Sequence, residues 1–427
     1  MTPQPLQPCT LAEAARYWHR LGWLSFGGPA GQIAMMHTDL VERRQWIDER
    51  SFSHGLNYCL LLPGPEAMQL ATYVGWRLHG VAGGLAAGLL FVLPGALLMV
   101  LLSWAFLQFG QLPAVDGLLL GLQAAVLGVI AHAIAKLAGR VLRTPLSWLL
   151  AGAAMLCLSL GWLPFPLLLV LLGLIGIMVW RWRPAWLPAA AEAQPTSNGT
   201  RRPRPGRALL LAAALLLAWW LPLLLLRGWL GGDSTSAQMG SFFSLTALVT
   251  VGGAYAVLPF VAQHATAGAG WLSPEQMLVG LGLAETTPGP LILVLLFVGF
   301  TGGWQQPDLA SPLASALLGT GTTLWATFLP CFLFVLPVAP WIEGLRRWPA
   351  ASAALTAISA AVVGVMAHLG YWFGQHLLAA SSGLDRVFIL LLAVGTLALL
   401  RPGRIPLPLL ILGAGLMGSG WRLLVSA

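Results

Sequence analysis

Long stretches of this chain carry no charged side chain, and they limit its fold more than any other feature. Among them are residues 117–135, 144–180, 208–226, 309–342 and 348–384. A helix needs about 20 predominantly apolar residues to cross the hydrocarbon core of a bilayer. Because the stretches are continuously apolar rather than alternating, they predict transmembrane helices and exclude a transmembrane β-barrel. We therefore expect an all-α polytopic membrane protein.

Composition agrees with this class. Only 8% of the 427 residues are charged, whereas soluble domains carry about 25%. The excess of 22 Lys and Arg over 14 Asp and Glu does not indicate a nucleic-acid partner, because the basic residues lie mostly in short loops, where membrane topology explains them. The four cysteines have no metal-ligand spacing, so we expect neither a metal nor another cofactor.

The chain contains an internal duplication. Each copy has a Gly-Gly pair, a tryptophan and a Pro-Gly-Pro turn, and the two copies are offset by 225 residues. The first is Gly27-Gly28, Trp46 and Pro63-Gly64-Pro65, and the second is Gly252-Gly253, Trp271 and Pro288-Gly289-Pro290. Further along, Pro94 matches Pro330 at an offset of 236, which predicts an insertion near residues 305–311. Two related halves in an apolar chain are typical of membrane transporters.

This duplication predicts two repeats, residues 1–182 and 227–427. A cytoplasmic linker at 183–207 and a connecting transmembrane helix at 208–226 join them. In the first repeat we expect four full spans, and broken or hairpin helices at 11–43 and 51–75. The four spans lie near 80–107, 115–136, 145–160 and 163–182. Since the broken segments either cross or re-enter, the total is about nine to thirteen membrane crossings.

Charge predicts the orientation of the repeats. One extra helix between two repeats with even numbers of crossings inverts the second repeat. With the N-terminus in the cytoplasm, 19 of the 22 Lys and Arg lie inside, and only Arg227, Arg386 and Arg422 lie outside. This asymmetry is what the positive-inside rule requires. We expect inverted-topology repeats in a multi-pass protein of the cell inner (plasma) membrane.

The Pro-Gly-Pro turns are the first candidates for a substrate pathway. A helix broken at membrane depth exposes backbone polar groups, which is tolerated where the break is buried in protein or lines a polar cavity. The N-terminus of a half-helix also offers N–H donors to an anion. Pro63, Gly64, Pro65, Pro288, Gly289 and Pro290 are therefore candidate pathway residues, and a kink needed only for packing is the alternative. Gly27, Gly28, Gly252 and Gly253 either approach substrate with bare backbone or allow close helix packing.

Two acidic residues lie deep in apolar segments, and each adjoins a Pro-Gly-Pro turn. They are Glu66 and Glu285. An ionisable group inside a membrane indicates function, and proton coupling is the function we expect. For Glu66, a favourable position at a helix N-terminus is the alternative. Arg16 and Arg20, one helical turn apart, either line an anion entrance or extend to the cytoplasmic interface.

These motifs resemble the chromate ion transporter family in its long-chain, two-domain form. The similar stretches are Phe26 to Gln32, Leu62 to Gly75, Val251 to Pro259 and Thr287 to Pro290. The resemblance implies efflux of chromate from the cytoplasm, driven by the proton gradient and conferring chromate resistance, with sulfate as the isosteric competitor. The second copy departs from the first at Val251, in place of Phe26, and at Ala254, in place of Pro29.

Other functions stay open at this point. A transporter of sulfate or another oxyanion is the main alternative, and an anion channel is the next. An intramembrane enzyme is not expected, because Lys136 is the only lysine and neither paired membrane aspartates nor a metal motif occurs. The expected partners are chromate, protons and the lipid bilayer, and a homo-oligomer is compatible with the sequence.

Overall fold

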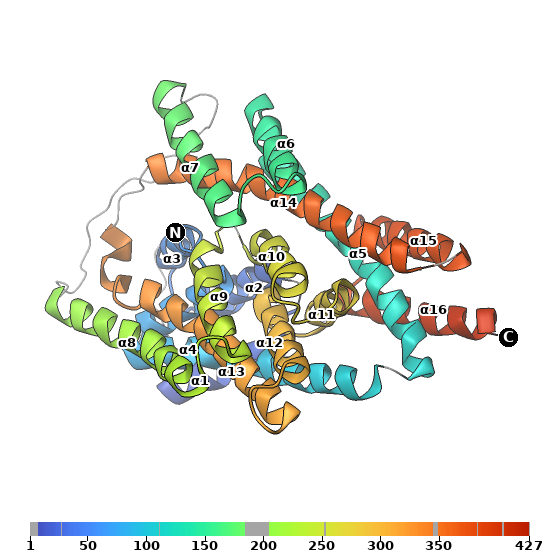
Figure 1. The fold of residues 1–427 in the computed structure, drawn as a ribbon. Helices are drawn as coiled ribbons and strands as arrows, with labels where there is room; N and C mark the ends of the chain where they lie inside the picture. The colour runs from blue at the N-terminus through green and yellow to red at the C-terminus, as the bar shows by residue number, and fades with distance from the viewer. Residues whose placement is uncertain are drawn as a thin grey trace.

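The computed structural model describes residues 7–26, 28–110, 112–183, 205–251, 253–344, 349–381, 383–403 and 405–426. All regular structure within these ranges is helical (Figure 1). Eight of the described helices are long and apolar enough to cross a bilayer, and two apolar helices, Pro145–Ser159 and Leu291–Gln305, are shorter. The predicted all-α polytopic fold class is therefore confirmed, whereas the total number of crossings stays a prediction.

The first half of the chain contains the predicted breaks. Segment 11–43 folds as two helices and a π-helical turn, and segment 51–75 is interrupted between Cys59 and Glu66. The elements are α1 (Leu11–Leu24), α2 (Gly28–His37), η1 (Thr38–Arg43), α3 (Glu49–Cys59), α4 (Glu66–Phe109), α5 (Pro113–Val141), α6 (Pro145–Ser159) and α7 (Phe165–Trp182).

The connecting helix, predicted at 208–226, is longer than expected and is α8 (Pro205–Leu230). Helix α8 starts at Pro205, inside the predicted 183–207 linker, because proline is well tolerated at the first position of a helix. Residues 184–204 of that linker lie outside the described residues. The elements are α8 (Pro205–Leu230), α9 (Thr235–Val249), α10 (Ala254–Gln263), η3 (His264–Gly268), α11 (Pro274–Thr286), η4 (Leu291–Leu293), α12 (Val294–Gln305), α13 (Pro312–Val335), η5 (Ala339–Gly344), α14 (Pro349–Ala380), α15 (Gly383–Leu400) and α16 (Leu407–Ser426).

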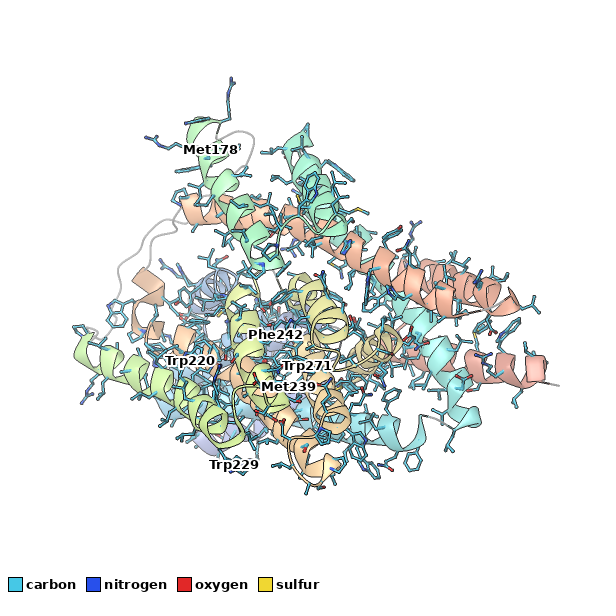
Figure 2. The ribbon with its side chains drawn as sticks, in the orientation of Figure 1. Met178, Trp220, Trp229, Met239, Phe242 and Trp271 are labelled. Atoms are coloured by element: carbon cyan, nitrogen blue, oxygen red, sulfur yellow. The ribbon has the colours of Figure 1, made fainter. Side chains whose placement is uncertain are left out.

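The two copies make the same local contacts at the 225-residue offset. The Trp46 N–H donates to the Leu40 carbonyl at 2.9 Å, and the Trp271 N–H donates to the Ala265 carbonyl at 2.7 Å. The Trp46 ring meets Tyr17 edge-on at 5.7 Å between ring centroids, and the Trp271 ring meets Phe242, the counterpart of Tyr17, at the same distance. Phe242 and Trp271 lie inside the bundle, whereas Trp229 at the end of α8 points away from it (Figure 2). The duplicated sequence therefore forms a duplicated structure.

Helix α4 contains a sharp reversal at the position of the predicted insertion. His79 and Gly80 leave helical geometry, and Gly80 has φ +66°, a conformation that glycine adopts readily. Gly75 then lies so close to the Gly83 carbonyl that a side chain at either glycine would overlap backbone. In the second copy α12 and α13 are two separate helices with residues 306–311 between them. The insertion near 305–311 is thus a longer connection within the same helical hairpin.

Helices late in each half pack on the other half. Helix α5 packs on α15 and α16, and α14 packs on α6 and α7. In Figure 1 the teal α5 accordingly lies beside the orange and red helices of the second half. Gly121 lies against the Ala414 backbone, and Gly176 lies against Ala353. Small residues at both crossings let the helix backbones approach closely, as is common in membranes.

Equivalent helices α5 and α14 run in opposite directions. Leu120, near the start of α5, shares a cavity wall with Ala380 at the end of α14. Farther along, Gly370 lies near Ile130, and Leu137, near the other end of α5, packs against the cluster that contains Val362 and Met366. The order of contacts along α5 is therefore the reverse of their order along α14.

Candidate functional site

Each Pro-Gly-Pro turn is hydrogen-bonded to the other half of the chain. The acceptor lies just before the Gly-Gly pair of that other half. The Gly64 N–H donates to the Thr250 carbonyl at 2.7 Å, and the Gly289 N–H donates to the Ser25 carbonyl at 2.9 Å. Both donors and both acceptors are related by the 225-residue offset, so one contact is made twice. We call these contacts the Gly64 clasp and the Gly289 clasp. They bring the predicted pathway motifs together in pairs that cross between the two halves.

The clasps depend on glycine geometry. Gly64 has φ +113° and Gly289 has φ +104°, which is the region that favours glycine over other residues. Gly28 and Gly253, the second members of the Gly-Gly pairs, also have positive φ, +71° and +99°. The first members, Gly27 and Gly252, lie outside the described residues. Four glycines with positive φ therefore lie at the two clasps and the adjoining Gly-Gly breaks.

Each Pro-Gly-Pro turn also lies against the proline-containing helix of the other copy. A Cβ atom added to Gly64 would lie 3.2 Å from the Cys331 sulfur of α13. Gly95 of α4, which is equivalent to Cys331 at the 236-residue offset, contacts the Pro288 carbonyl closely enough that a side chain there would overlap it. Gly64, Pro65 and residues 288–290 are buried, and Pro63 is partly buried. Backbone polar groups at these breaks are thus enclosed by protein, as a membrane requires.

Two fully buried glutamines hold the turns, and the sequence reasoning assigned them no role. The Gln32 side-chain amide donates to the Gly289 carbonyl at 2.6 Å and to the Ser25 carbonyl at 3.2 Å. The Gln69 amide donates to the Pro63 carbonyl at 2.6 Å. Both follow their motifs by a few residues in otherwise apolar segments, which is the signal that could have identified them. Their Oε1 atoms, and the Ser25 hydroxyl, are buried without a hydrogen-bond partner among the described residues.

The structure brings both acids, which are partly buried, close to the start of α10. Glu66, the first residue of α4, faces Gly253: a Cβ atom on that glycine would lie 3.4 Å from Glu66 Oε1. Glu285, in the last turn of α11, accepts a hydrogen bond of 2.5 Å from the Tyr255 hydroxyl. Gly253 is the N-cap of α10, and Tyr255 is its second residue. Glu66 therefore faces the N-cap of α10, where a carboxylate is favoured. Glu285, which is not equivalent to Glu66 in the repeats, is linked to the first turn of α10 through Tyr255.

Arg16 and Arg20 do not reach the clasps. Both lie on the exposed face of α1, and Arg16 Nε donates to the Ala12 carbonyl of its own helix at 3.4 Å. The opposite face of α1 packs on α4, where Gly22 lies against the Leu90 backbone. Their placement favours a role at the protein surface over direct contact with the Pro-Gly-Pro turns.

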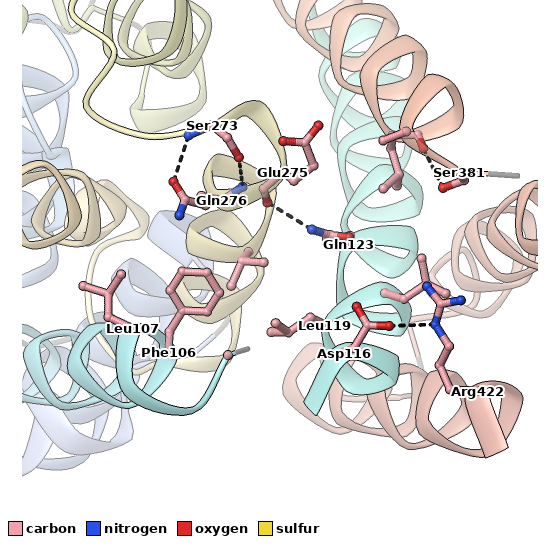
Figure 3. Close-up of a pocket in the computed structure, with 15 residues that line it drawn as sticks. Phe106, Leu107, Asp116, Leu119, Gln123, Ser273, Glu275, Gln276, Ser381 and Arg422 are labelled. Atoms are coloured by element: carbon pink, nitrogen blue, oxygen red, sulfur yellow. Dashed lines mark hydrogen bonds and ion pairs between the residues drawn. The ribbon is translucent and has the colours of Figure 1, made fainter. Parts of the chain in front are cut away.

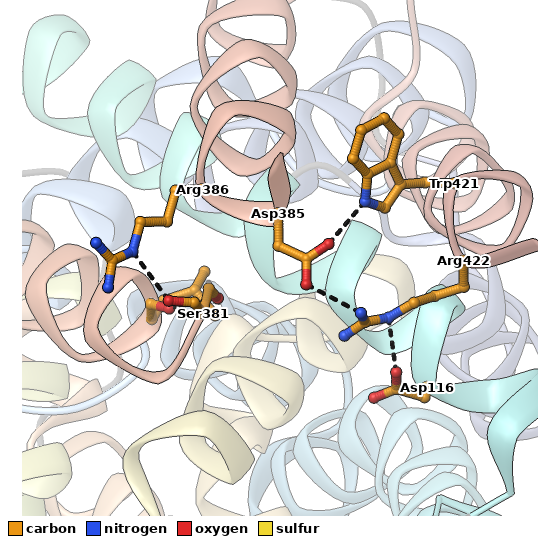
Figure 4. Close-up of polar contacts among 7 residues, drawn as sticks. Asp116, Ser381, Asp385, Arg386, Trp421 and Arg422 are labelled. Atoms are coloured by element: carbon orange, nitrogen blue, oxygen red, sulfur yellow. Dashed lines mark hydrogen bonds and ion pairs between the residues drawn. The ribbon is translucent and has the colours of Figure 1, made fainter. Parts of the chain in front are cut away.

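A cavity of about 380 Å³ opens away from the clasps, between the starts of α5 and α11 and the end of α14 (Figure 3). Gln123 of α5 lines the cavity, and its side-chain amide donates to the Glu275 carbonyl of α11 at 3.1 Å. At its edge Arg422 pairs with Asp116 at 2.8 Å and with Asp385 at 2.9 Å (Figure 4). This ion-pair network joins α5, α15 and α16 at one end of the bundle.

The family of this chain is shown by comparison with known sequences. The sequence model described as Chromate transporter matches residues 12–177 and 237–419, so one clasp partner of each pair lies in each matched region. The chain belongs to the chromate transporter family. The predicted resemblance is thereby confirmed, and the family supports a chromate transport function rather than an enzymatic one.

Three relatives align with most of the chain. The chromate transport protein of Cupriavidus metallidurans is 31% identical over 96% of this chain and 92% of the relative. The chromate transport protein of Pseudomonas aeruginosa is 32% identical over 81% of this chain and 77% of the relative. An uncharacterized transporter of Methanocaldococcus jannaschii is 25% identical over 77% and 75% of the two chains. No solved structure matches this member of the chromate transporter family.

Proposed function

We propose that this protein exports chromate from the cytoplasm in exchange for protons and so confers chromate resistance. The observation that carries the proposal is the pair of clasps, in which the broken helices of one half meet those of the other. Transporters place substrate at such discontinuous helices, between two repeats and near the midplane of the bilayer. The identity of the proposed substrate, chromate, comes from the relatives named chromate transport proteins.

The anion pathway is proposed to pass between the two clasps. Chromate is a tetrahedral oxyanion with two negative charges, and half-helix N-termini offer it backbone N–H donors and a positive partial charge. The starts of α2, α4 and α10 and of η4 follow the four motif breaks directly. Arg16 and Arg20 are proposed to attract the anion toward the protein from the cytoplasmic face. Sulfate has the same shape and charge and is the expected competitor.

The proton-coupling groups are proposed to be Glu66 and Glu285. Both are partly buried, and both adjoin the start of α10. Protonation of a carboxyl group in an apolar surrounding removes a charge that is costly there. Proton uptake from outside would therefore change the stability of the packing around the second Gly-Gly pair, which links the proton gradient to a movement of the pathway.

The repeats, 1–182 and 227–427, are proposed to have inverted topology in the cell inner membrane, with the N-terminus and the 183–207 linker in the cytoplasm. The opposite directions of α5 and α14 support this arrangement. So does Arg422, which pairs with Asp116 and Asp385 at one end of the bundle, the end that the charge distribution places outside. Inversion allows one scaffold to open alternately to either side.

Chromate uptake into everted membrane vesicles tests the proposal. Everted vesicles turn export into uptake, and an imposed pH gradient, acid inside, supplies the driving force. We expect Glu66→Gln and Glu285→Gln each to reduce gradient-driven uptake at least about tenfold, a loss of about 1.4 kcal/mol in the coupled step. Glu275→Gln, on the same helix as Glu285 but at the cavity edge, is the control and should transport normally.

Two outcomes contradict the proposal separately. If both variants keep full proton-dependent uptake, the acids do not couple protons. If wild-type flux ignores the pH gradient, the protein is an anion channel. Competition by sulfate and molybdate in the same assay ranks the oxyanions, and preference for one of them over chromate would replace the proposed substrate.

A further inference from the structure

A tyrosine–carboxyl pair occurs in only one of the two copies. The Tyr255 hydroxyl donates to Glu285 Oε1 at 2.5 Å. At the 225-residue offset the corresponding residues are Ala30 and Leu60, which cannot form a hydrogen bond through their side chains. The duplication therefore provides an internal reference: the same scaffold folds without this pair, so the fold does not require it.

The pair connects two elements of the proposed pathway. Tyr255 lies two residues after Gly253, on the first turn of α10, and Glu285 lies three residues before the Pro288 turn, at the end of α11. The hydrogen bond therefore links the second Gly-Gly break to the second Pro-Gly-Pro turn within one copy. The Gly64 and Gly289 clasps, in contrast, link breaks of different copies.

We propose that Tyr255 is a positioning residue for proton coupling, whose hydroxyl holds the Glu285 carboxylate at the start of α10 and releases it on protonation. The inference rests on the proposed function of Glu285. A phenol hydroxyl donates strongly to an ionised carboxylate, and a protonated carboxyl group competes as a donor. Proton binding at Glu285 therefore weakens the link between α10 and α11 and frees the first turn of α10, which also faces Glu66.

Several other titratable groups on the helices packed against α11 have neighbours other than Glu285. Glu66 of α4 faces Gly253, and His368 of α14 is hydrogen-bonded to Ser159 at 3.0 Å. On α5, Asp116 pairs with Arg422 of α16, and His132 lies near Lys136 and Arg401. Among the described residues, Tyr255 is the titratable side chain hydrogen-bonded to Glu285. A change in the protonation of Glu285 therefore acts first on its hydrogen bond with Tyr255.

The test is the pH profile of chromate uptake in everted vesicles, normalised to the amount of transporter in the membrane. Four proteins are compared: wild type, Tyr255→Phe, Glu285→Gln and the double variant. Tyr58→Phe is the control, because the Tyr58 hydroxyl also makes one hydrogen bond, 3.0 Å to the Phe334 carbonyl, and its residue is also partly buried. It removes the same atom without touching an acid.

We expect Tyr255→Phe to move the midpoint of the pH profile to higher pH by about one unit or more, since the lost hydrogen bond favoured the ionised carboxylate. The Tyr58→Phe profile should keep the wild-type midpoint. In the Glu285→Gln background, Tyr255→Phe should have no further effect, because the two residues act as one unit.

An unshifted midpoint in Tyr255→Phe overturns the inference, and so does an equal shift in Tyr58→Phe. A full additional loss in the double variant also overturns it, because Tyr255 would then act independently of Glu285. Failure of the proposed function gives a different result. In that case the Glu285→Gln single variant would keep the wild-type dependence of chromate uptake on the proton gradient.

Discussion

Single glycines and glutamines decide whether the broken helices can meet. Gly95 leaves no space beside the Pro288 carbonyl. The Gln32 amide donates to the Gly289 carbonyl and to the Ser25 carbonyl, which also accepts from the Gly289 N–H. Proline and glycine break a helix for local steric reasons, so the positions of the turns were predictable from the sequence. The partner of Gln32 was not, because it lies 257 residues away and is chosen by tertiary packing.

Gly95→Ala tests the close contact at the Gly289 clasp. The added methyl group would overlap the Pro288 carbonyl, so we expect a loss of about 1–3 kcal/mol in stability and a loss of transport. Gly152→Ala is the matched control, because it is also a helical glycine but has nothing within 4 Å of the added atom. Thermal unfolding of the purified proteins in detergent measures the difference, and equal melting temperatures would contradict the contact.

Gln32→Leu tests the glutamine. The substitution keeps a similar side-chain volume but leaves the Gly289 carbonyl without its side-chain donor, which costs about 1–3 kcal/mol for a buried group. We expect lower thermal stability and slower chromate uptake, whereas Gln375→Leu at an exposed position should change neither. Wild-type uptake by Gln32→Leu would show that the backbone contact alone holds the turn.

At the scale of elements, α8 has no counterpart in the first half and covers α9 and α13. It is held by the Trp219 indole, which donates to Ser244 Oγ at 3.2 Å, and by the Trp325 indole, which donates to the Ala218 carbonyl at 2.9 Å. Apolar length predicted this helix, but uniformly apolar sequence carries no amphipathic signal. Which face of α8 meets protein therefore had to come from the structure.

Leu223 and Leu217 distinguish the two faces of α8. Leu223 is 8% exposed and lies against Gly240, whereas Leu217 is 64% exposed. Leu223→Ala should destabilise the protein by about 1–3 kcal/mol through lost packing, and Leu217→Ala should be neutral, because lipid replaces what is removed. Unfolding by denaturing detergent, followed by the loss of helical circular dichroism, compares them. A larger loss of stability in Leu217→Ala than in Leu223→Ala would contradict this assignment, because the Leu217 face of α8 would then be the one packed on protein.

At the scale of the whole molecule, the two copies exchange contacts rather than packing as separate bodies. The sequence predicted the duplication and the class of fold because spacing and apolar length are local properties. It could not predict that Glu66 and Glu285 share the start of α10, since the two positions are not equivalent in the repeats. Asymmetric chemistry on a duplicated scaffold is visible only once the copies are placed together.

Inverted topology makes a prediction about access from outside the cell. Glu42 and Ala267 are equivalent positions, and both are exposed. In a cysteine-free background, a membrane-impermeant maleimide added to intact cells should label Ala267→Cys and leave Glu42→Cys unlabelled, and permeabilised cells should label both. Labelling of both in intact cells would contradict the inversion. Labelling of Glu42→Cys alone would keep the inversion and contradict the cytoplasmic N-terminus.

The packing of α16 on α5 has a consequence for the order of events during synthesis. Gly117 and Gly121 of α5 lie against the backbone of Gly418 and Ala414, so this surface of α5 stays uncovered until α16 has been synthesised. An early helix must therefore wait in the membrane, with its small-residue surface facing lipid, for more than half of the chain to be translated. The docking of α16 is therefore a late step in the assembly of this transporter, although its partner helix α5 is made early.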